Sequence, residues 1–272
     1  MTLLLIPYPE IDPILVQIGP LAIRWYALAY IAGLVIGWRI MRRVCEQPPR
    51  LLSPEKIDDF LLWAALGVIL GGRIGYVLFY KPTFFLANPL QILTLWEGGM
   101  SFHGGLLGVV VAILAFSLKN RVNTFMLSDL VAMVAPIGLF FGRLANFING
   151  ELWGRPTDVP WAMIFPRGGL VPRHPSQIYQ AFFEGVVLFS IVMIVWKVAD
   201  ARRRPALLTG VFCIGYGCAR IGGELFREPD SFLGFLWGTS WITMGMLLSV
   251  PLMLFGLGLI VYAFSRPPLP KT

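Results

Sequence analysis

The sequence predicts an all-α, polytopic integral membrane protein with about seven transmembrane helices. Of its 272 residues, 57% are hydrophobic and only 14% are charged, and the mean hydropathy is +0.72. Several uninterrupted apolar runs approach the length of about 20 residues that a helix needs to cross a bilayer. A soluble domain of this size does not carry so much apolar surface.

The apolar runs place the predicted helices in order along the chain. The first 20 residues are not expected to be a cleavable signal peptide, because they lack a basic start and prolines and acidic residues interrupt them. The predicted spans are about 21–40, 57–80, 101–118, 124–148, 176–198, 206–224 and 239–263.

The connections between these spans alternate in charge. One set carries 13 basic residues: Arg39, Arg42, Arg43, Arg50, Lys56, Lys119, Arg121, Lys197, Arg202, Arg203, Arg204, Arg266 and Lys271. The other set carries five: Lys81, Arg155, Arg167, Arg173 and Arg227. Since basic loops stay in the cytoplasm, we expect the amino terminus outside and the carboxyl terminus inside. Topology thus accounts for the net charge of +7, and no nucleic-acid partner is expected.

Two long connections fall on the predicted outer side. The segment 81–100 is apolar but too short to span, which is typical of a piece lying in the membrane interface. The segment 150–175 is rich in Gly, Pro and Arg, and we expect an ordered loop there. Both would form a small periplasmic head. We find no internal repeat and no separable soluble domain, so residues 1–272 are expected to form one membrane-embedded domain.

The most informative stretch runs from Gly142 to Gly154, at the end of the fourth predicted span. An arginine such as Arg143 is costly in lipid, so it usually faces a protein interior or a wet cavity. The alternative is an arginine that extends to the headgroups. Asn146 favours the first interpretation, because it lies three residues on, on the same helical face.

Further cations lie at a similar depth. Arg24, His103, Arg143 and Arg220 all fall in the predicted outer half of the membrane. The acidic residues near that depth are fewer, namely Glu151, Glu184 and Glu224. This excess of positive charge indicates a site for an anion.

Two local patterns have both a structural and a functional interpretation. His103 stands between glycine pairs just before a span, where it could exchange a proton near neutral pH or only cap a helix. Tyr216, Arg220 and Glu224 form a polar stripe at i, i+4 and i+8. Glu224 could neutralise Arg220 or orient it toward a ligand, and the two roles are compatible.

The aromatic residues near the span ends have a simpler interpretation. Tyr26 and, beside Arg73, Tyr76 and Tyr80 fit interfacial anchors, an interpretation we favour for Tyr76 and Tyr80.

Several chemistries find no support in the sequence. It contains no P-loop, no His/Cys metal cluster and no Gly-x-Ser-x-Gly elbow, so we expect no metal and no organic cofactor. Cys213 and Cys218 are five residues apart and face different sides of one predicted helix, and with Cys45 they imply no disulfide.

At this point the sequence resembles the bacterial prolipoprotein diacylglyceryl transferases. The resemblance rests on Gly142-Arg143-x-x-Asn146-Phe147-x-Asn149-x-Glu151-x-x-Gly154. Supporting segments are 101–105 (SFHGG), 174–180 (HPSQIYQ) and Tyr216-Gly217-x-x-Arg220 followed by Glu224 and Arg227. These segments occur in family order from Tyr26 to Arg227, which covers nearly the whole chain.

The resemblance implies a specific activity. The family transfers the sn-1,2-diacylglyceryl group of phosphatidylglycerol to the lipobox cysteine of a prolipoprotein that still carries its signal peptide. A thioether forms and glycerol phosphate leaves, as the first step of lipoprotein maturation. The implied location is the bacterial inner membrane, with the active site toward the periplasmic leaflet. The reacting thiol belongs to the substrate, so the enzyme needs no cysteine of its own.

The resemblance and the residue chemistry together assign candidate roles. We expect Arg143 and Arg220 to stabilise the departing phosphate, because a guanidinium fork suits a phosphodiester. His103 is the candidate base for the thiol, and a nearby arginine that favours the thiolate is its competitor. Substrate binding, or the holding of the arginines, is expected of a larger set: Tyr26, Arg143, Asn146, Glu151, Gly154, Tyr216 and Glu224. Gly154 would act through loop geometry.

Two other classes of function were weighed. An anion or lipid translocator would also have a basic cavity, but it needs access from both leaflets, and inverted repeats are typical of such proteins. A non-catalytic scaffold would not need several arginines at one depth. Both fit the sequence less well than a transferase.

Overall fold

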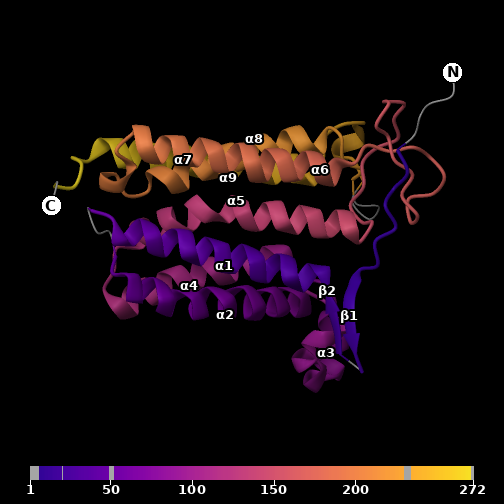
Figure 1. Ribbon diagram of the computed structural model, residues 1–272, viewed down its shortest axis with the longest axis horizontal. Helices are drawn as coiled ribbons and strands as arrows, with labels where there is room; N and C mark the ends of the chain where they lie inside the picture. Colours follow the sequence, from indigo (N-terminus) through magenta and orange to yellow (C-terminus); the bar gives the residue numbers. More distant parts are fainter. Residues whose placement is uncertain (1–5, 20, 49–51, 230–233, 271–272) are drawn as a thin grey trace. The chain divides into compact units, whose positions relative to one another are not determined.

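The computed structural model describes residues 6–19, 21–48, 52–229 and 234–270. Arg50 and Lys271, counted above among the cytoplasmic basic residues, lie outside the described residues. The chain forms two compact units. Figure 1 labels the helices and strands along the chain. We call residues 38–128 the continuous unit, and residues up to 37 together with those from 129 onward the split unit.

The described part of the chain is mostly helical. Its long helical segments are α1 (Trp25–Glu46), α2 (Pro54–Phe79), α4 (Phe102–Asn120), α5 (Thr124–Ile148), the run formed by α6 (Ser176–Gln180), η3 (Ala181–Val187) and α7 (Leu188–Val198), α8 (Leu207–Glu224) and α9 (Met244–Ser265). Short elements complete the chain: β1 (Ile14–Ile18), β2 (Leu21–Arg24), α3 (Pro82–Ala87), η1 (Pro89–Leu93), η2 (Leu95–Glu97), η4 (Ala201–Arg203) and η5 (Leu236–Gly238).

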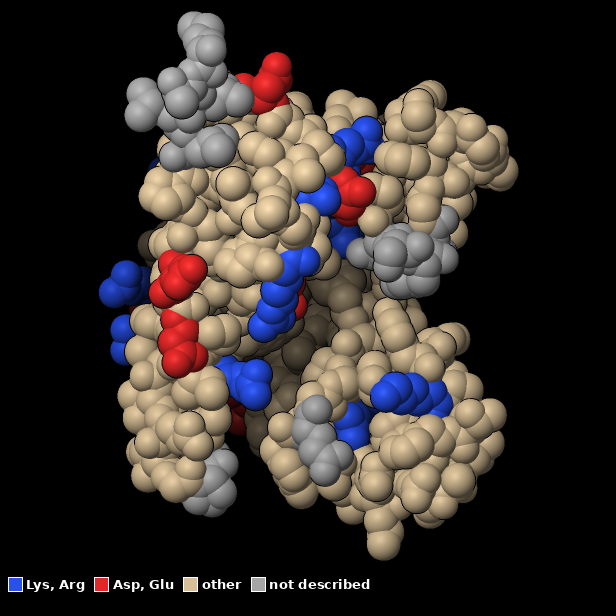
Figure 2. All heavy atoms as spheres, turned by 90° about the vertical axis from the view of Figure 1, so that its right-hand side faces the viewer, with Lys and Arg blue, Asp and Glu red and all other residues tan. Residues whose placement is uncertain are grey.

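Among the described residues, five helical segments are long and apolar enough to cross a membrane. They are α2, α4, α5, the run Ser176–Val198 and α9. The helices α1 and α8 are less apolar, because α1 carries several arginines and α8 carries Arg220, Glu224 and several glycines. Most of the surface in Figure 2 is neither acidic nor basic, as expected for a helical membrane protein.

The first predicted span differs from the structure. We predicted a helix over 21–40, but Leu21–Arg24 is strand β2, which pairs antiparallel with β1, and α1 begins at Trp25 and continues to Glu46. The cause is local. Ile14–Ile18 is rich in β-branched residues, which favour strands, and Gly19 adopts a φ of +58°, which suits the turn between them.

Small residues let α2 and α4 pack closely in the continuous unit. A Cβ added to Gly67 would lie 2.7 Å from the carbonyl oxygen of Gly108, and one added to Gly71 would overlap that of Gly104. In lipid the hydrophobic effect does not favour the association of helices. Close van der Waals contact between small residues therefore stabilises the packing of membrane helices. Gly104, in the glycine pair beside His103, therefore serves helix packing.

Arg73 on α2 organises the segment that follows it. Its side chain is 4% exposed, and its guanidinium donates to the carbonyl oxygens of residues in the segment 91–99. The shortest of these bonds, to Gln91 and Gly98, are 2.5 Å. A buried arginine is thus satisfied by carbonyl groups, and it fixes the fold of η1 and η2.

The split unit contains two further close helix contacts. Gly33 of α1 lies against Gly138 of α5, where an added Cβ would be 3.1 Å from the Gly138 Cα. Gly210 of α8 lies against Gly256 of α9, where the corresponding distance to the Gly256 carbonyl oxygen is 2.7 Å. At the start of α8, the buried carboxylate of Asp129 accepts from the Thr209 backbone N–H at 2.8 Å. The same carboxylate oxygen accepts from the Thr209 hydroxyl at 2.6 Å.

The α2–α4 contact can be tested by making the same glycine-to-alanine substitution at two positions. Gly71→Ala should destabilise the protein by about 1–3 kcal/mol, because the new methyl overlaps backbone that cannot move away. Gly105→Ala is the matched control, since its Cβ would lie 3.6 Å from the Val68 carbonyl oxygen, an ordinary contact. Thermal unfolding in detergent compares the two variants. Equal stability of both would contradict the packing argument.

Candidate functional site

Arg143, near the end of α5, is held by a buried carboxylate. Both its Nε and its Nη2 lie 2.9 Å from Oε2 of Glu184, which comes from η3 and is fully buried. The arginine side chain remains 14% exposed. The ion pair with Glu184 fixes the position of the Arg143 guanidinium. Because the side chain is not fully buried, it can also contact a ligand.

A second arginine lies near the same carboxylate. Arg220 of α8 places Nη2 2.6 Å from Oε1 of Glu224, one helical turn on. Its Nη1 is 3.9 Å from Oε1 of Glu184. Glu224, 1% exposed, also receives Arg227 Nη1 at 3.1 Å. The sequence prediction that Glu224 contacts Arg220 is confirmed.

These ion pairs connect five charged groups, which we call the arginine cluster: Arg143, Arg220, Arg227, Glu184 and Glu224. Three are cations and two are anions. Charges taken out of water are costly unless they are paired. Guanidinium groups gathered in such a place favour an anionic ligand.

A separate hydrogen-bond chain starts three residues after Arg143. Asn146, 6% exposed, donates from Nδ2 to the Tyr26 hydroxyl at 3.2 Å and to Glu151 Oε1 at 2.8 Å. Asn149 reaches the same Glu151 oxygen at 3.3 Å. The buried Gln177 donates to the Glu151 backbone carbonyl at 2.7 Å. Arg143 and Asn146 thus have different hydrogen-bond partners, but Tyr26, which accepts from Asn146, also interacts electrostatically with Arg143.

The segment 150–175 is ordered, and backbone contacts and hydrogen bonds join it to the end of α8 and the residues that follow. Gly154 and Arg227 form an isolated β-bridge, and Arg155 donates to the backbone carbonyls of Glu224 and Arg227. A Cβ on Gly154 would lie 2.5 Å from the His174 carbonyl oxygen and 2.7 Å from that of Phe226. Three chain segments therefore meet at Gly154, and a larger residue would separate them.

His174 lies at the end of this segment. Burial lowers the pKa of the His174 imidazole below its ordinary value. Its Nδ1 is 3.2 Å from the Tyr179 hydroxyl oxygen, which accepts from the Trp161 indole N–H. A neutral His174 that accepts from Tyr179 satisfies all three groups. This arrangement agrees with the lowered pKa.

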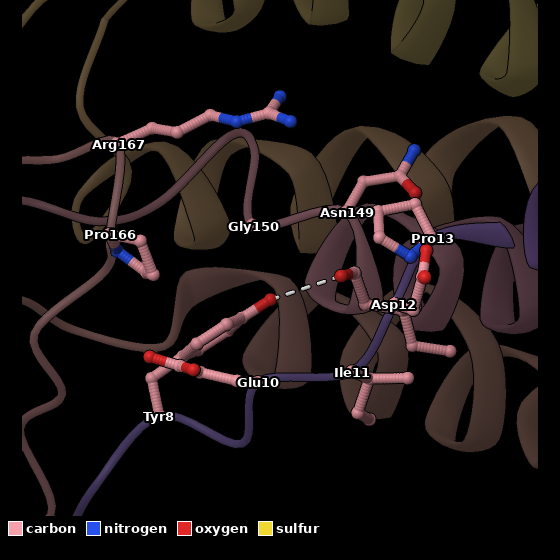
Figure 3. Close-up of a pocket in the computed structure, with 10 residues that line it drawn as sticks. Tyr8, Glu10, Ile11, Asp12, Pro13, Asn149, Gly150, Pro166 and Arg167 are labelled. Atoms are coloured by element: carbon pink, nitrogen blue, oxygen red, sulfur yellow. Dashed lines mark hydrogen bonds between the residues drawn. The ribbon is translucent and has the colours of Figure 1, made fainter.

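A pocket of about 330 Å³, with both polar and apolar lining residues, lies beside the end of α5. Figure 3 shows its lining from the amino-terminal segment, the α5 end and Arg167. The Tyr8 hydroxyl donates to the Phe147 and Ile148 carbonyls, at the end of the helix. Burial raises the pKa of the Tyr8 phenol above its ordinary value. This pocket was not predicted, because the prolines and acidic residues of the amino-terminal stretch were interpreted only as evidence against a signal peptide.

The remaining predicted residues have these positions. His103 is the second residue of α4, in the continuous unit, where it is exposed and its ring contacts Phe102. Tyr216 lies on α8, one turn before Arg220, and stacks on Phe212 with ring centroids 5.9 Å apart. Arg24 is the last residue of β2.

Sequence reasoning named Glu184 only as an acid near the right depth. A stronger signal was available in the spacing of Gln177, Gln180 and Glu184, which puts three polar groups on one face of an apolar helix. In the structure these side chains are at most 1% exposed. Polar residues that recur at helical spacing inside a span face protein rather than lipid.

Comparison with known proteins identifies the family of this chain. Residues 13–262 match the family model described as prolipoprotein diacylglyceryl transferase. A relative from Paramagnetospirillum magneticum, named phosphatidylglycerol–prolipoprotein diacylglyceryl transferase, is 57% identical over 95% of this chain and 96% of its own length. Relatives of the same name from Rhodospirillum rubrum and Methylocella silvestris are 55% and 56% identical over 97% of this chain, and over 96% and 98% of their own lengths. The chain belongs to the prolipoprotein diacylglyceryl transferase family.

Proposed function

We propose that this protein transfers the sn-1,2-diacylglyceryl group of phosphatidylglycerol to the lipobox cysteine of prolipoproteins. Family membership and the shared name of relatives more than half identical support this activity. The observation in the molecule that carries it is the arginine cluster, whose guanidinium groups, held by buried carboxylates, suit the planar oxygens of a phosphodiester.

The reaction makes one bond and breaks one. The cysteine sulfur bonds to the diacylglyceryl carbon that bears the phosphate. The carbon–oxygen bond breaks, its electron pair stays on the phosphate oxygen, and glycerol phosphate leaves. Negative charge therefore grows on the phosphate during the reaction. Arg143 and Arg220 stabilise that growing charge more than the ground state, which is the condition for catalysis.

The thiol must lose its proton for this attack. A free thiol has a pKa of about 8.5, so most of it is protonated at neutral pH. We assign His103 as the group that takes the proton, with the positive field of the arginines as the alternative. Tyr26, Asn146 and Glu151 form the hydrogen-bond chain that fixes the end of α5 and offers polar groups to the lipid headgroup.

The proposed location is the bacterial inner membrane, with seven spans and the amino terminus outside. Five helical segments have the length and composition of membrane spans. The basic loops alternate along the chain only if α1 and α8 also cross the membrane, so we count these two helices as the other spans. Arg143 and Arg220 then lie toward the periplasmic leaflet. The segments 81–100 and 150–175 form the periplasmic head, and the two compact units act as one transferase.

Purified protein, phosphatidylglycerol and a lipobox peptide test the activity. The protein should form thioether-linked peptide and release glycerol phosphate, and Arg143→Ala should lower kcat/KM by about 100-fold or more. Arg39→Ala, on the exposed face of α1, is the control and should keep full activity. Equal turnover by Arg143→Ala would make that arginine structural. No product from well-folded wild type would point to an anion or lipid translocator instead.

His103→Gln tests the source of the base. Activity near pH 7 should fall by about 100-fold or more, since general bases contribute that much. It should recover as pH approaches about 8.5, where the thiolate forms unaided. Phosphatidylglycerol binding and thermal stability are measured alongside as controls. Turnover near the wild-type level at pH 7 would assign thiol activation to the arginines.

Cysteine labelling in intact cells tests the orientation. Asn88→Cys should react with a membrane-impermeant thiol reagent, because we place residues 81–100 outside. Gln47→Cys should react only after lysis. Both positions are exposed, and the unsubstituted chain reports the background from its own cysteines. The reverse pattern would invert the proposed topology.

A further inference from the structure

The pocket at the end of α5 lies close to the arginine that is proposed to bind the phosphate. Ile148 and Asn149 line this pocket, and Ile148 is the last residue of the helix that carries Arg143. Arg143 and Ile148 are five positions apart, so the pocket begins about 7.5 Å further along the helix axis. Asn149 also donates to Glu151, which accepts from Asn146 as well. The pocket therefore adjoins the hydrogen-bond chain of the site.

Contacts between distant segments fix the walls of the pocket. The Tyr8 hydroxyl donates to the carbonyl oxygens of Phe147 and Ile148, which ties the amino-terminal segment to the last turn of α5. The Tyr8 ring packs against Phe147 and the fully buried Phe165, with ring centroids 5.3 Å and 5.1 Å away. Gly150 has a φ of +59°, and a Cβ there would lie 3.2 Å from the Tyr8 hydroxyl oxygen. The pocket is thus built by the fold of the split unit.

The lining offers hydrogen-bonding groups of both kinds. Figure 3 shows the carboxylates of Glu10 and Asp12 and the guanidinium of Arg167 around the pocket. All three residues are exposed, so a ligand can reach them. Carboxylates accept hydrogen bonds and a guanidinium donates them, and a peptide backbone can pair with both because it has N–H and C=O groups. A lipid phosphate would instead meet two carboxylates of like charge.

The size and the place of the pocket suit a short piece of extended chain. Its volume of about 330 Å³ is at the lower end of the range of ligand pockets, roughly 300–1,000 Å³. The basic start of a signal peptide stays in the cytoplasm, so the chain beyond the lipobox cysteine leaves on the outer side. In the proposed topology the end of α5 lies there. Extended chain covers about 3.3–3.6 Å per residue, so about two residues after the cysteine reach from Arg143 to the pocket.

We propose that this pocket binds the prolipoprotein just beyond its lipobox cysteine. The third residue after the cysteine, and the one or two that follow, lie in the pocket as extended chain. Their N–H groups donate to the Glu10 carboxylate, and their carbonyl oxygens accept from Arg167. The proposal rests on the transferase function above. It gives the acceptor an anchor outside the membrane, built from other residues than the arginine cluster that binds the lipid.

Two lipobox peptides test this assignment. The short peptide ends in an amide one residue after the cysteine, and the long peptide continues for six residues. Wild-type protein should have a KM for the long peptide that is lower by about tenfold, since contacts worth about 1.4 kcal/mol change affinity by that factor. Glu10→Ala and Arg167→Ala should each raise the KM for the long peptide by about three- to tenfold. The kcat/KM for the short peptide and the KM for phosphatidylglycerol should follow wild type.

Two matched controls accompany these variants. Asp158→Ala removes an exposed acid of the segment 150–175 that is not among the described lining residues, and Arg39→Ala removes an exposed arginine of α1. Both controls should keep the wild-type KM for the long peptide. Thermal unfolding of every variant shows whether a loss of activity reflects a loss of folding.

Photolabelling gives a readout that does not depend on turnover. A peptide with serine in place of the cysteine lacks the thiol that the reaction consumes, so it reports binding alone. A benzophenone side chain three residues after this serine should label residues 8–13, 148–150 or 166–167. The same group six residues before the serine, inside the signal peptide, should label none of them.

The outcomes separate the possible roles of the pocket. Equal KM values of wild type for the two peptides, or labelling elsewhere in the chain, would overturn the proposal. Equal losses of the variants on both peptides would make Glu10 and Arg167 structural residues. A raised KM for phosphatidylglycerol alone would assign the pocket to the lipid headgroup. Absence of product from wild type with either peptide would refute the transferase function, whereas the photolabelling would still test peptide binding.

Discussion

The site depends on the pairing of arginines with carboxylates that are taken out of water. A lone guanidinium at this depth would turn toward the headgroups or destabilise the fold. Glu184 and Glu224 make it possible for Arg143 and Arg220 to stay inside the helical bundle of the split unit. The two carboxylates hold three guanidinium groups among the described residues. This pairing fixes the direction of the guanidinium groups, which suit an anionic ligand.

Helix packing and electrostatics are coupled in this arrangement. The carboxylate of Glu184 reaches α5 because Gly185 brings the two backbones together. At the start of α9, a Cβ on Gly245 would lie 2.8 Å from the Glu224 carboxylate, so that glycine makes room for the second acid. Small residues therefore have two roles in this protein. They increase van der Waals contact between helices, and they admit charged groups that need short distances.

The sequence predicted what depends on local patterns, and it was less successful with contacts between distant segments. Apolar runs located the helices from α2 onward, and the i, i+4 spacing predicted the Arg220–Glu224 pair. Strand β2 was missed, because a short apolar run before a helix has the same hydropathy as the helix itself. The Arg143–Glu184 pair joins residues 41 positions apart. Helical periodicity predicts on which face of its helix a residue lies, but it does not predict which other helix that face contacts.

The division of the chain has a consequence for its synthesis. The continuous unit is made from one uninterrupted stretch, and its Arg73 hydrogen bonds join residues 18 to 26 positions apart. Local contacts of this kind form quickly. The split unit needs its amino-terminal part and the segments beyond residue 129 together. On the ribosome, residues 38–128 can fold first, whereas the part of α1 before residue 38 must wait for the segments beyond residue 129. The arginine cluster, whose members lie between Arg143 and Arg227, can thus assemble only after the continuous unit has been made.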